Sequence, residues 1–180
     1  MNADFTVKLG EPTSAEPVTL QELKDQLKID FDTDNTLLTL LVSAARDRIE
    51  RWAGVSLVHR SVNNIVKLDG CNLYELPYGP VSDSNSVTVT FLSLSGGSMM
   101  SLGPTWFIGE DGEFMQIKPP DAAMYAITYN AGYDVVPAAL KTAVLHQAAY
   151  MYEHRGDESG IDGLSPTAMM LAKAYRRVVI

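Results

Sequence analysis

The sequence predicts an α+β protein in which N-terminal and C-terminal helices form a helical bundle with a small antiparallel β region inserted between them. Apolar residues recur with helical spacing in two segments, 34–57 and 137–155. Between these segments, short alternating runs are broken by Gly, Pro, Asn and Asp, which is typical of strands and turns. We therefore expect a mobile arm over residues 1–16, a discontinuous helical bundle over 17–57 and 136–180, and the inserted antiparallel β region over 58–135.

Composition and charge limit the classes of function that this chain can serve. Its 180 residues can bury a core, and 46% hydrophobic with 20% charged residues is ordinary for a globular protein. The net charge is −8 and no run of Lys or Arg is present, whereas nucleic-acid binders usually carry a basic patch. The first residues lack the features of a signal peptide, and no window approaches the roughly 18 apolar residues of a membrane span. A single cysteine, Cys71, excludes an internal disulfide, so we expect synthesis in a reducing cytoplasm.

The first helix is predicted from its N-terminal signals. Thr19 and Glu22 have the spacing of a capping box, and Val18 with Leu23 has that of a hydrophobic staple. The helix is expected to be short and to end near Lys28.

The long helix over residues 34–57 is the element on which the other helices are expected to pack. Asp34 places negative charge at its N-terminus, and Gly54 is positioned for a left-handed C-terminal cap. One face is apolar, and Arg46 and Glu50 are expected on the opposite, polar face. The core residues expected from this helix are Leu37, Leu41, Ala45, Ile49 and Trp52.

The inserted region is predicted to be an antiparallel sheet of short strands. Gly96-Gly97 and Asp111-Gly112 indicate two-residue hairpin turns, because these residues tolerate a positive φ. The candidate strands are Val62 to Leu68, Leu73 to Leu76, Val87 to Leu94, Thr105 to Ile108, Glu113 to Ile117 and Tyr125 to Tyr129.

Two further helices are expected after the sheet. Pro137 is suited to the first turn of a helix that runs to about Arg155, and its expected core residues are Leu140, Val144, Ala148 and Met151. A glycine-rich and acidic link follows, and Ser165-Pro166 provides a cap and a first-turn proline for the last helix. The chain then ends in two cations and three apolar residues, which either pack on its own core or dock on a partner.

No motif for catalysis, a cofactor or a metal rises above background. Asp30, Asp32 and Asp34 alternate like the start of a calcium loop, but Asn35 and Leu41 occupy the positions where that loop needs Gly and Glu. The zinc-protease, Walker, dinucleotide-binding and serine-hydrolase motifs are all missing from the sequence. We therefore predict no catalytic residue, no cofactor and no metal. A pair of carboxylates that meet only in space stays open, and with it a small hydrolase.

The order of the segments resembles the head–tail adaptor family of tailed bacteriophages, also called connector, head-completion or putative DNA-packaging proteins. The resemblance covers about half of the chain. The residues that carry it are the stretch Val18 to Asp30, then Asp34, Leu37, Leu41, Ala44-Ala45-Arg46, Ile49-Glu50, Gly54 and Leu57, then Leu76-Pro77 with Pro80-Val81, Tyr129 to Tyr133 with Pro137, Tyr152 to Arg155, and Ala174 to Arg176.

The resemblance implies a non-catalytic virion protein of the phage neck, made in the host cytoplasm. Members form a ring of about twelve copies between the portal and the tail or stopper protein, and genomic DNA passes through the bore during ejection. The sheet would then face neighbouring subunits or the next tail component. The C-terminal helix would dock on the portal, which assigns docking to Pro166, Leu171, Tyr175, Arg176, Arg177, Val178, Val179 and Ile180.

Alternative functions lead to different expectations. A tail-completion or tail-terminator subunit would also form a ring, but it would not contact the portal. A small hydrolase would need a concave pocket with a perturbed acid and would be active as a monomer. A DNA-binding regulator would show salt-dependent binding, which the net charge of −8 disfavours.

Overall fold

The computed structural model describes residues 5–69, 74–82, 87–92, 100–102, 107–108, 116–117, 122–155 and 164–176. The chain divides into two units. Among the described residues, those up to Ser14 and from Val58 to Asp134 form the β unit, and those from Ala15 to Leu57 and from Val135 to Arg176 form the helical unit. The chain therefore passes between the units three times, after Ser14, after Leu57 and after Asp134.

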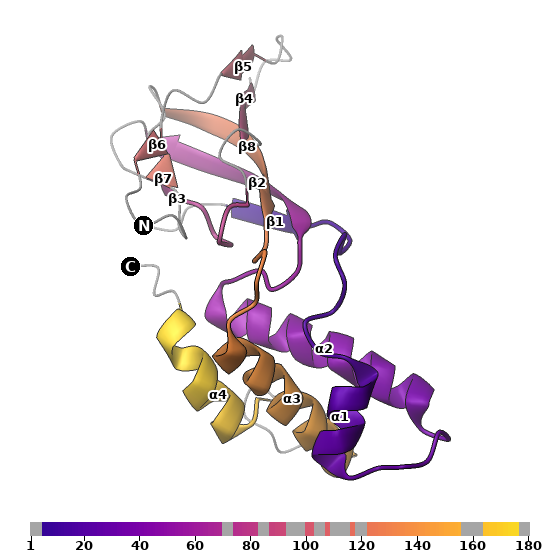
Figure 1. Cartoon of the computed structure of the whole chain (residues 1–180). Coiled ribbons are helices and arrows are strands. Elements are labelled where there is room, and N and C mark those ends of the chain that lie inside the picture. The colour runs from indigo at the N-terminus through magenta and orange to yellow at the C-terminus, as the bar shows by residue number, and fades with distance from the viewer. Residues whose placement is uncertain are drawn as a thin grey trace. The chain divides into compact units, whose positions relative to one another are not determined.

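The larger sheet of the β unit is antiparallel and has the strand order β1-β2-β8-β4-β5 (Figure 1). Its strands are β1 (Phe5–Leu9), β2 (Arg60–Asp69), β8 (Ala122–Ala131), β4 (Thr88–Leu92) and β5 (Met100–Leu102). A second sheet has the order β3-β7-β6, with β3 (Tyr74–Glu75), β7 (Gln116–Ile117) and β6 (Phe107–Ile108). The sheet therefore places β2 beside β8, which is far away in sequence.

The central pair of strands follows the alternation that the sequence shows. Strands β2 and β8 pair along their whole length, with Val62 opposite Tyr129 and Val66 opposite Tyr125. Val62, Asn64 and Val66 of β2 are buried, whereas Asn63 and Ile65 between them are exposed, because successive residues of a strand point to opposite faces. The core that results contains Val62, Val66, Leu76, Val87, Tyr125, Ile127, Tyr129 and Ala131.

All the strands predicted from the sequence correspond to strands in the structure. Strands β2 and β8 are longer than expected, and the other four predicted strands include residues outside the described part of the chain. Strand β5 was not predicted, and neither was β1. Phe5–Leu9 pairs with β2 as an edge strand instead of forming a mobile arm, because Val7 and Leu9 pack against the core of the sheet. The turns predicted at Gly96-Gly97 and Asp111-Gly112 lie outside the described residues.

The helical unit contains the helices α1 (Leu20–Leu27), α2 (Asn35–Ala53), α3 (Ala138–Glu153) and α4 (Pro166–Ala172). The 3₁₀ helix η3 (Lys173–Tyr175) continues α4. Helix α2 contacts α1, α3 and α4, and α3 also contacts α1 and α4 (Figure 1). None of the described helices is long and apolar enough to cross a membrane.

The helix ends confirm the capping signals of the sequence. The Thr19 backbone N–H donates to a Glu22 carboxylate oxygen at 2.7 Å, and the Glu22 N–H donates to Thr19 Oγ1 at 3.2 Å, which completes the capping box. Gly54 ends α2 with a φ of 70°, in the left-handed region that favours glycine. Ser165 Oγ accepts a hydrogen bond from the Ala168 N–H at 3.1 Å, and Pro166 occupies the first turn of α4.

The buried face of α2 is rotated by one residue from the face that the spacing suggested. Leu37, Leu41 and Trp52 are only half-buried. The fully buried apolar residues of the helix are Leu38, Val42, Ala45, Ile49 and Ala53. The helix carries two overlapping apolar rows, and periodicity alone does not tell which of them packs against the other helices. On α3, Leu140, Val144 and Ala148 are buried as expected, whereas Met151 is half-buried.

Candidate assembly surfaces

The first turn of α4 is anchored to α3 by buried polar contacts. The Ser165 backbone N–H donates to Gln147 Oε1 at 2.7 Å, and both residues are buried. Ala168 and Ala172 are also buried, so one side of α4 lies on the rest of the helical unit. Buried polar groups that are paired hold a segment in one place, because an alternative position would leave them unsatisfied. Helix α4 is therefore a fixed platform for the residues that follow it.

The opposite side of α4 and η3 faces solvent. Pro166 and Arg176 are exposed, and Leu171 and Tyr175 are half-buried. The Arg176 guanidinium carbon lies 4.7 Å from the centroid of the Trp52 ring, a cation–π contact that ties the end of η3 to α2. These four predicted docking residues thus lie on one short helical segment. The other four, Arg177, Val178, Val179 and Ile180, lie outside the described residues, and the docking role of all eight stays a prediction.

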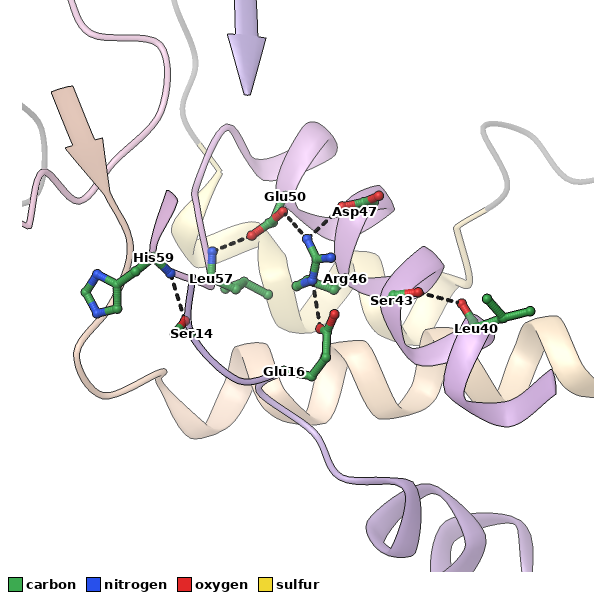
Figure 2. A network of polar contacts seen from close by, with 9 residues as sticks. All are labelled: Ser14, Glu16, Leu40, Ser43, Arg46, Asp47, Glu50, Leu57 and His59. Atoms are coloured by element: carbon green, nitrogen blue, oxygen red, sulfur yellow. Dashed lines mark hydrogen bonds and ion pairs between the residues drawn. The ribbon is translucent and has the colours of Figure 1, made fainter. Parts of the chain in front are cut away.

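A buried cluster of charges surrounds Arg46 on α2 (Figure 2). Arg46 Nε donates to Glu16 at 2.7 Å, and Nη1 donates to Asp47 at 2.7 Å and to Glu50 at 2.9 Å. The second oxygen of Glu50 accepts a hydrogen bond from the Leu57 N–H at 2.6 Å. Only 5% of the Arg46 side chain and 2% of the Glu50 side chain are exposed. The cluster therefore fastens the segment before α1 and the segment after α2 to the same helix.

The expectation that Arg46 and Glu50 lie on a solvent-facing side of the helix was wrong. Burial by itself lowers the pKa of Arg46, but the hydrogen bond to Glu16 and the negative charges of Glu50, Glu16 and Asp47 outweigh burial and raise it. The guanidinium therefore stays charged. The opposite charges of Arg46 and Glu50 at i and i+4 are visible in the sequence, but Glu16 lies 30 residues away and carries no such signal.

A second cluster joins the start of α2 to the end of α3. The Tyr152 hydroxyl donates to Asp34 Oδ2 at 2.6 Å, and Arg155 Nη1 lies 3.8 Å from the same oxygen. The Arg155 guanidinium carbon lies 4.1 Å from the centroid of the Tyr152 ring. The hydrogen bond to Asp34 raises the pKa of Tyr152, so the hydroxyl keeps its proton as a donor. Asp34 occupies the N-cap position of α2, where the sequence places its negative charge, but its side chain makes no cap hydrogen bond and binds Tyr152 of α3 instead.

In the β unit, the segments that lead to the helical unit are hydrogen-bonded to one another. The Thr13 N–H and hydroxyl donate to the His59 carbonyl at 2.7 and 2.8 Å, and the His59 N–H donates to Ser14 Oγ at 2.9 Å (Figure 2). His59 Nε2 lies 3.2 Å from Asp134 Oδ1. Gly132, with a φ of +146°, leaves no room for a Cβ atom, which would lie 2.7 Å from the His59 Cα.

Several acidic side chains of the described residues make structural contacts. Asp32 Oδ1 accepts from Lys24 Nζ at 2.8 Å and from Asn35 Nδ2 at 3.1 Å, whereas Asp34 accepts from Tyr152, so these two aspartates serve different partners. Among the described residues, no group of three or more His, Cys, Asp or Glu side chains could hold a metal ion. Cys71 lies outside these residues.

The mixed architecture of helices and a small antiparallel sheet agrees with the α+β class that the sequence predicts and that its resemblance to phage head–tail connector proteins implies. The family model of the head completion protein (HCP) matches residues 16–173, so this chain belongs to the head completion protein family. No relative of this sequence was found among the curated proteins.

Solved structures with the same fold come from gene transfer agent (GTA) particles. A chain from the neck of an empty GTA particle, computed with C6 symmetry, is 21% identical, and the match covers 97% of both chains with a TM-score of 0.72. A chain from the virion of a native GTA particle is 23% identical over 94% of this chain and 96% of the other, with a TM-score of 0.69. A chain from the neck of a native GTA particle, computed with C12 symmetry, is 23% identical over 96% and 97%, with a TM-score of 0.67. At these identities the matches establish a shared fold.

Proposed function

We propose that this chain is a structural subunit of the neck of a phage-like virion, a head–tail adaptor that forms a ring between the portal and the tail or stopper protein. The observation that carries the proposal is membership of the head completion protein family, together with the fold shared over nearly the whole chain with proteins of GTA necks and virions. The protein acts through its contacts and catalyses no reaction.

The proposed ring contains about twelve copies, and the C12 symmetry with which the neck of the native GTA particle was computed supports this number. In a closed ring each subunit presents two different surfaces to its two neighbours. We propose that the helical unit acts as one bundle that carries these contacts, because the Arg46 and Asp34 clusters tie its segments together.

Genomic DNA passes through the proposed bore without specific binding. The net charge of −8, repeated around a ring, repels phosphate and so keeps DNA from adhering to the wall. A wall of this kind suits packaging and ejection, in which the DNA moves through the neck.

The proposed docking element for the portal is the C-terminal segment from Pro166 onward. Ser165 and Gln147 anchor the start of α4, so the exposed face of the segment is held in a constant position. Leu171 and Tyr175 supply partly exposed apolar surface, and Arg176 supplies a cation beside them. An apolar patch with a charged edge is a common composition for a protein–protein contact.

Assembly measurements with the purified chain test this function. We expect mass photometry and negative-stain imaging to detect rings when the chain is mixed with the portal protein of the same particle. Deletion of Val178 to Ile180 should weaken this co-assembly and leave the circular dichroism spectrum unchanged, and the control Lys141→Ala, at an exposed cation on α3, should assemble normally. Normal co-assembly of the truncated chain would contradict the docking role. Rings that form but do not bind the portal protein would indicate a tail-completion or tail-terminator subunit.

A further inference from the structure

We propose that the outer face of α2 in one subunit contacts the turn before α2 in a second copy of the chain, and that this pair of surfaces forms the subunit contact of the ring. The inference rests on the proposed function. The outer face of α2 is the row Leu37, Leu40, Leu41 and Ala44, continued by Arg48 and Arg51. The acidic turn is Asp30-Phe31-Asp32.

The outer face is apolar, and the described residues of its own unit cover it only in part. One side of the helix carries four apolar residues that follow one another at intervals of three, one and three positions, namely Leu37, Leu40, Leu41 and Ala44. The Leu40 side chain is 62% exposed, and the other three are half-buried. Figure 2 shows Leu40 lying apart from the Arg46 cluster. The deeply buried row of α2, which begins at Leu38, is a different one. Helix α2 is therefore apolar on two sides, of which the described residues of its own unit fully bury one.

The two surfaces are complementary in charge and polarity. The row ends toward the C-terminus of α2 with Arg48 and Arg51, both exposed. Phe31 is 47% exposed, and the exposed carboxylates of Asp30 and Asp32 flank it in the sequence. Hydrogen bonds from Lys24 and Asn35 and the charge of Lys24 lower the pKa of Asp32, so this carboxylate is ionised at neutral pH. In the proposed contact, Phe31 of one subunit packs against the apolar row of α2 in the next subunit. The carboxylates of Asp30 and Asp32, the latter also paired with Lys24, then face Arg48 and Arg51.

Geometry assigns the partner to a second copy and not to the same chain. Sixteen residues separate Asn35, the first residue of α2, from Arg51, which corresponds to about 24 Å along the helix axis. The acidic turn directly precedes α2, so it cannot reach the arginines of its own helix. A ring needs two different surfaces on each subunit. The acidic turn and the outer face of α2 provide such a pair.

A charge exchange within the full-length chain tests the contact. Under conditions where the wild-type chain forms rings, with portal protein if it is required, we expect Arg51→Glu and Asp30→Arg each to weaken the association between subunits by about tenfold, which corresponds to about 1.4 kcal/mol. The double variant Asp30→Arg/Arg51→Glu should recover most of the ring fraction, because the two charges then attract again across the contact. Lys141→Glu, which reverses an exposed cation on α3, should leave assembly unchanged.

A second pair of variants tests the apolar part of the contact. Leu40→Asp should abolish rings, whereas Val135→Asp, at a side chain that is 83% exposed before α3, should retain contacts between subunits. Circular dichroism should report a wild-type fold for both variants. If rings form but the double charge variant assembles no better than the single variants, or if Leu40→Asp assembles normally, this inference fails while the proposed function stands. If the wild-type chain forms no ring with or without portal protein, the proposed function fails first. Loss of DNA binding in place of loss of rings would assign the arginines to DNA and would also overturn the inference.

Discussion

Replacement of Arg46 by alanine is the most informative perturbation of the helical unit. The substitution removes the guanidinium that pairs with Glu50, whose carboxylate is almost fully buried and also accepts a hydrogen bond from the Leu57 N–H. It also releases Glu16 and frees the segment before α1. We expect a large loss of stability, because removing one partner of a buried ion pair is costly.

The structure separates the contributions of the three carboxylates. Glu16 and Asp47 have 33% and 43% of their side chains exposed, so solvent screens both pairs and each contributes about 0.2–1 kcal/mol. Removal of one partner of a buried pair such as Arg46 and Glu50 costs about 3–5 kcal/mol. The buried pair therefore dominates, and Arg46→Ala should cost about 4 kcal/mol.

Urea denaturation followed by circular dichroism measures this effect. With an m-value of about 2 kcal/mol/M, the midpoint should fall by about 2 M. The double variant Arg46→Met/Glu50→Met should be more stable than Arg46→Ala, because no unpaired charge stays buried. The control Arg51→Ala, at an exposed arginine of the same helix, should lie within about 0.5 kcal/mol of wild type. A midpoint for Arg46→Ala equal to that of the control would refute the argument that this cluster is buried and paired.

Two further predictions concern the helix start and the helix core. Glu22→Ala should destabilise the protein at neutral pH. Hydrogen bonds from Thr19 hold the pKa of Glu22 below its ordinary value of 4.5. The stability that this carboxylate contributes is therefore complete above pH 4.5 and is lost as the pH falls through the lower pKa of the folded state. Denaturation midpoints of variant and wild type should therefore converge in acid. Leu38→Ala should cost about 2–5 kcal/mol, and Leu37→Ala less, since only Leu38 is fully buried; urea denaturation of both variants measures the difference.

Matched comparisons decide both results. Glu153→Ala removes an exposed carboxylate on α3 and should not reproduce the pH dependence of Glu22→Ala. If the difference between Glu22→Ala and wild type were the same at pH 3 and pH 7, the capping contact would not depend on the ionised carboxylate. Equal losses for Leu37→Ala and Leu38→Ala would show that the buried row of α2 is not the one that the structure assigns.

Local contacts explain why the helix boundaries were predictable. The capping box joins Thr19 to Glu22, three residues away, and Ser165 caps α4 through the N–H of Ala168, also three residues away. Gly54 ends α2 because of its own backbone freedom. Each signal is complete within one turn of helix, so the sequence displays it without knowledge of the rest of the fold.

The predicted strands illustrate the boundary between local and long-range information. Alternation in β2 identified which side chains share a face, and these side chains are buried together. The partner of β2 is β8, with Val62 opposite Tyr129, and no local pattern specifies that pairing. Strand β1 was missed because its hydrogen bonds and its apolar contacts both depend on β2.

The sequence by itself determined the α+β class, the capped starts of α1 and α4, the glycine that ends α2, the positions of six strands and the likeness to phage head–tail connectors. Only the tertiary structure decided which apolar row of α2 is buried, that Arg46 and Glu50 lie inside with Glu16 as a partner, and that Asp34 serves α3 instead of its own helix. The physical reason is the range of the contacts. Capping and periodicity act over three or four residues, whereas burial of a charge depends on the segment that happens to cover it, and that segment comes from elsewhere in the chain.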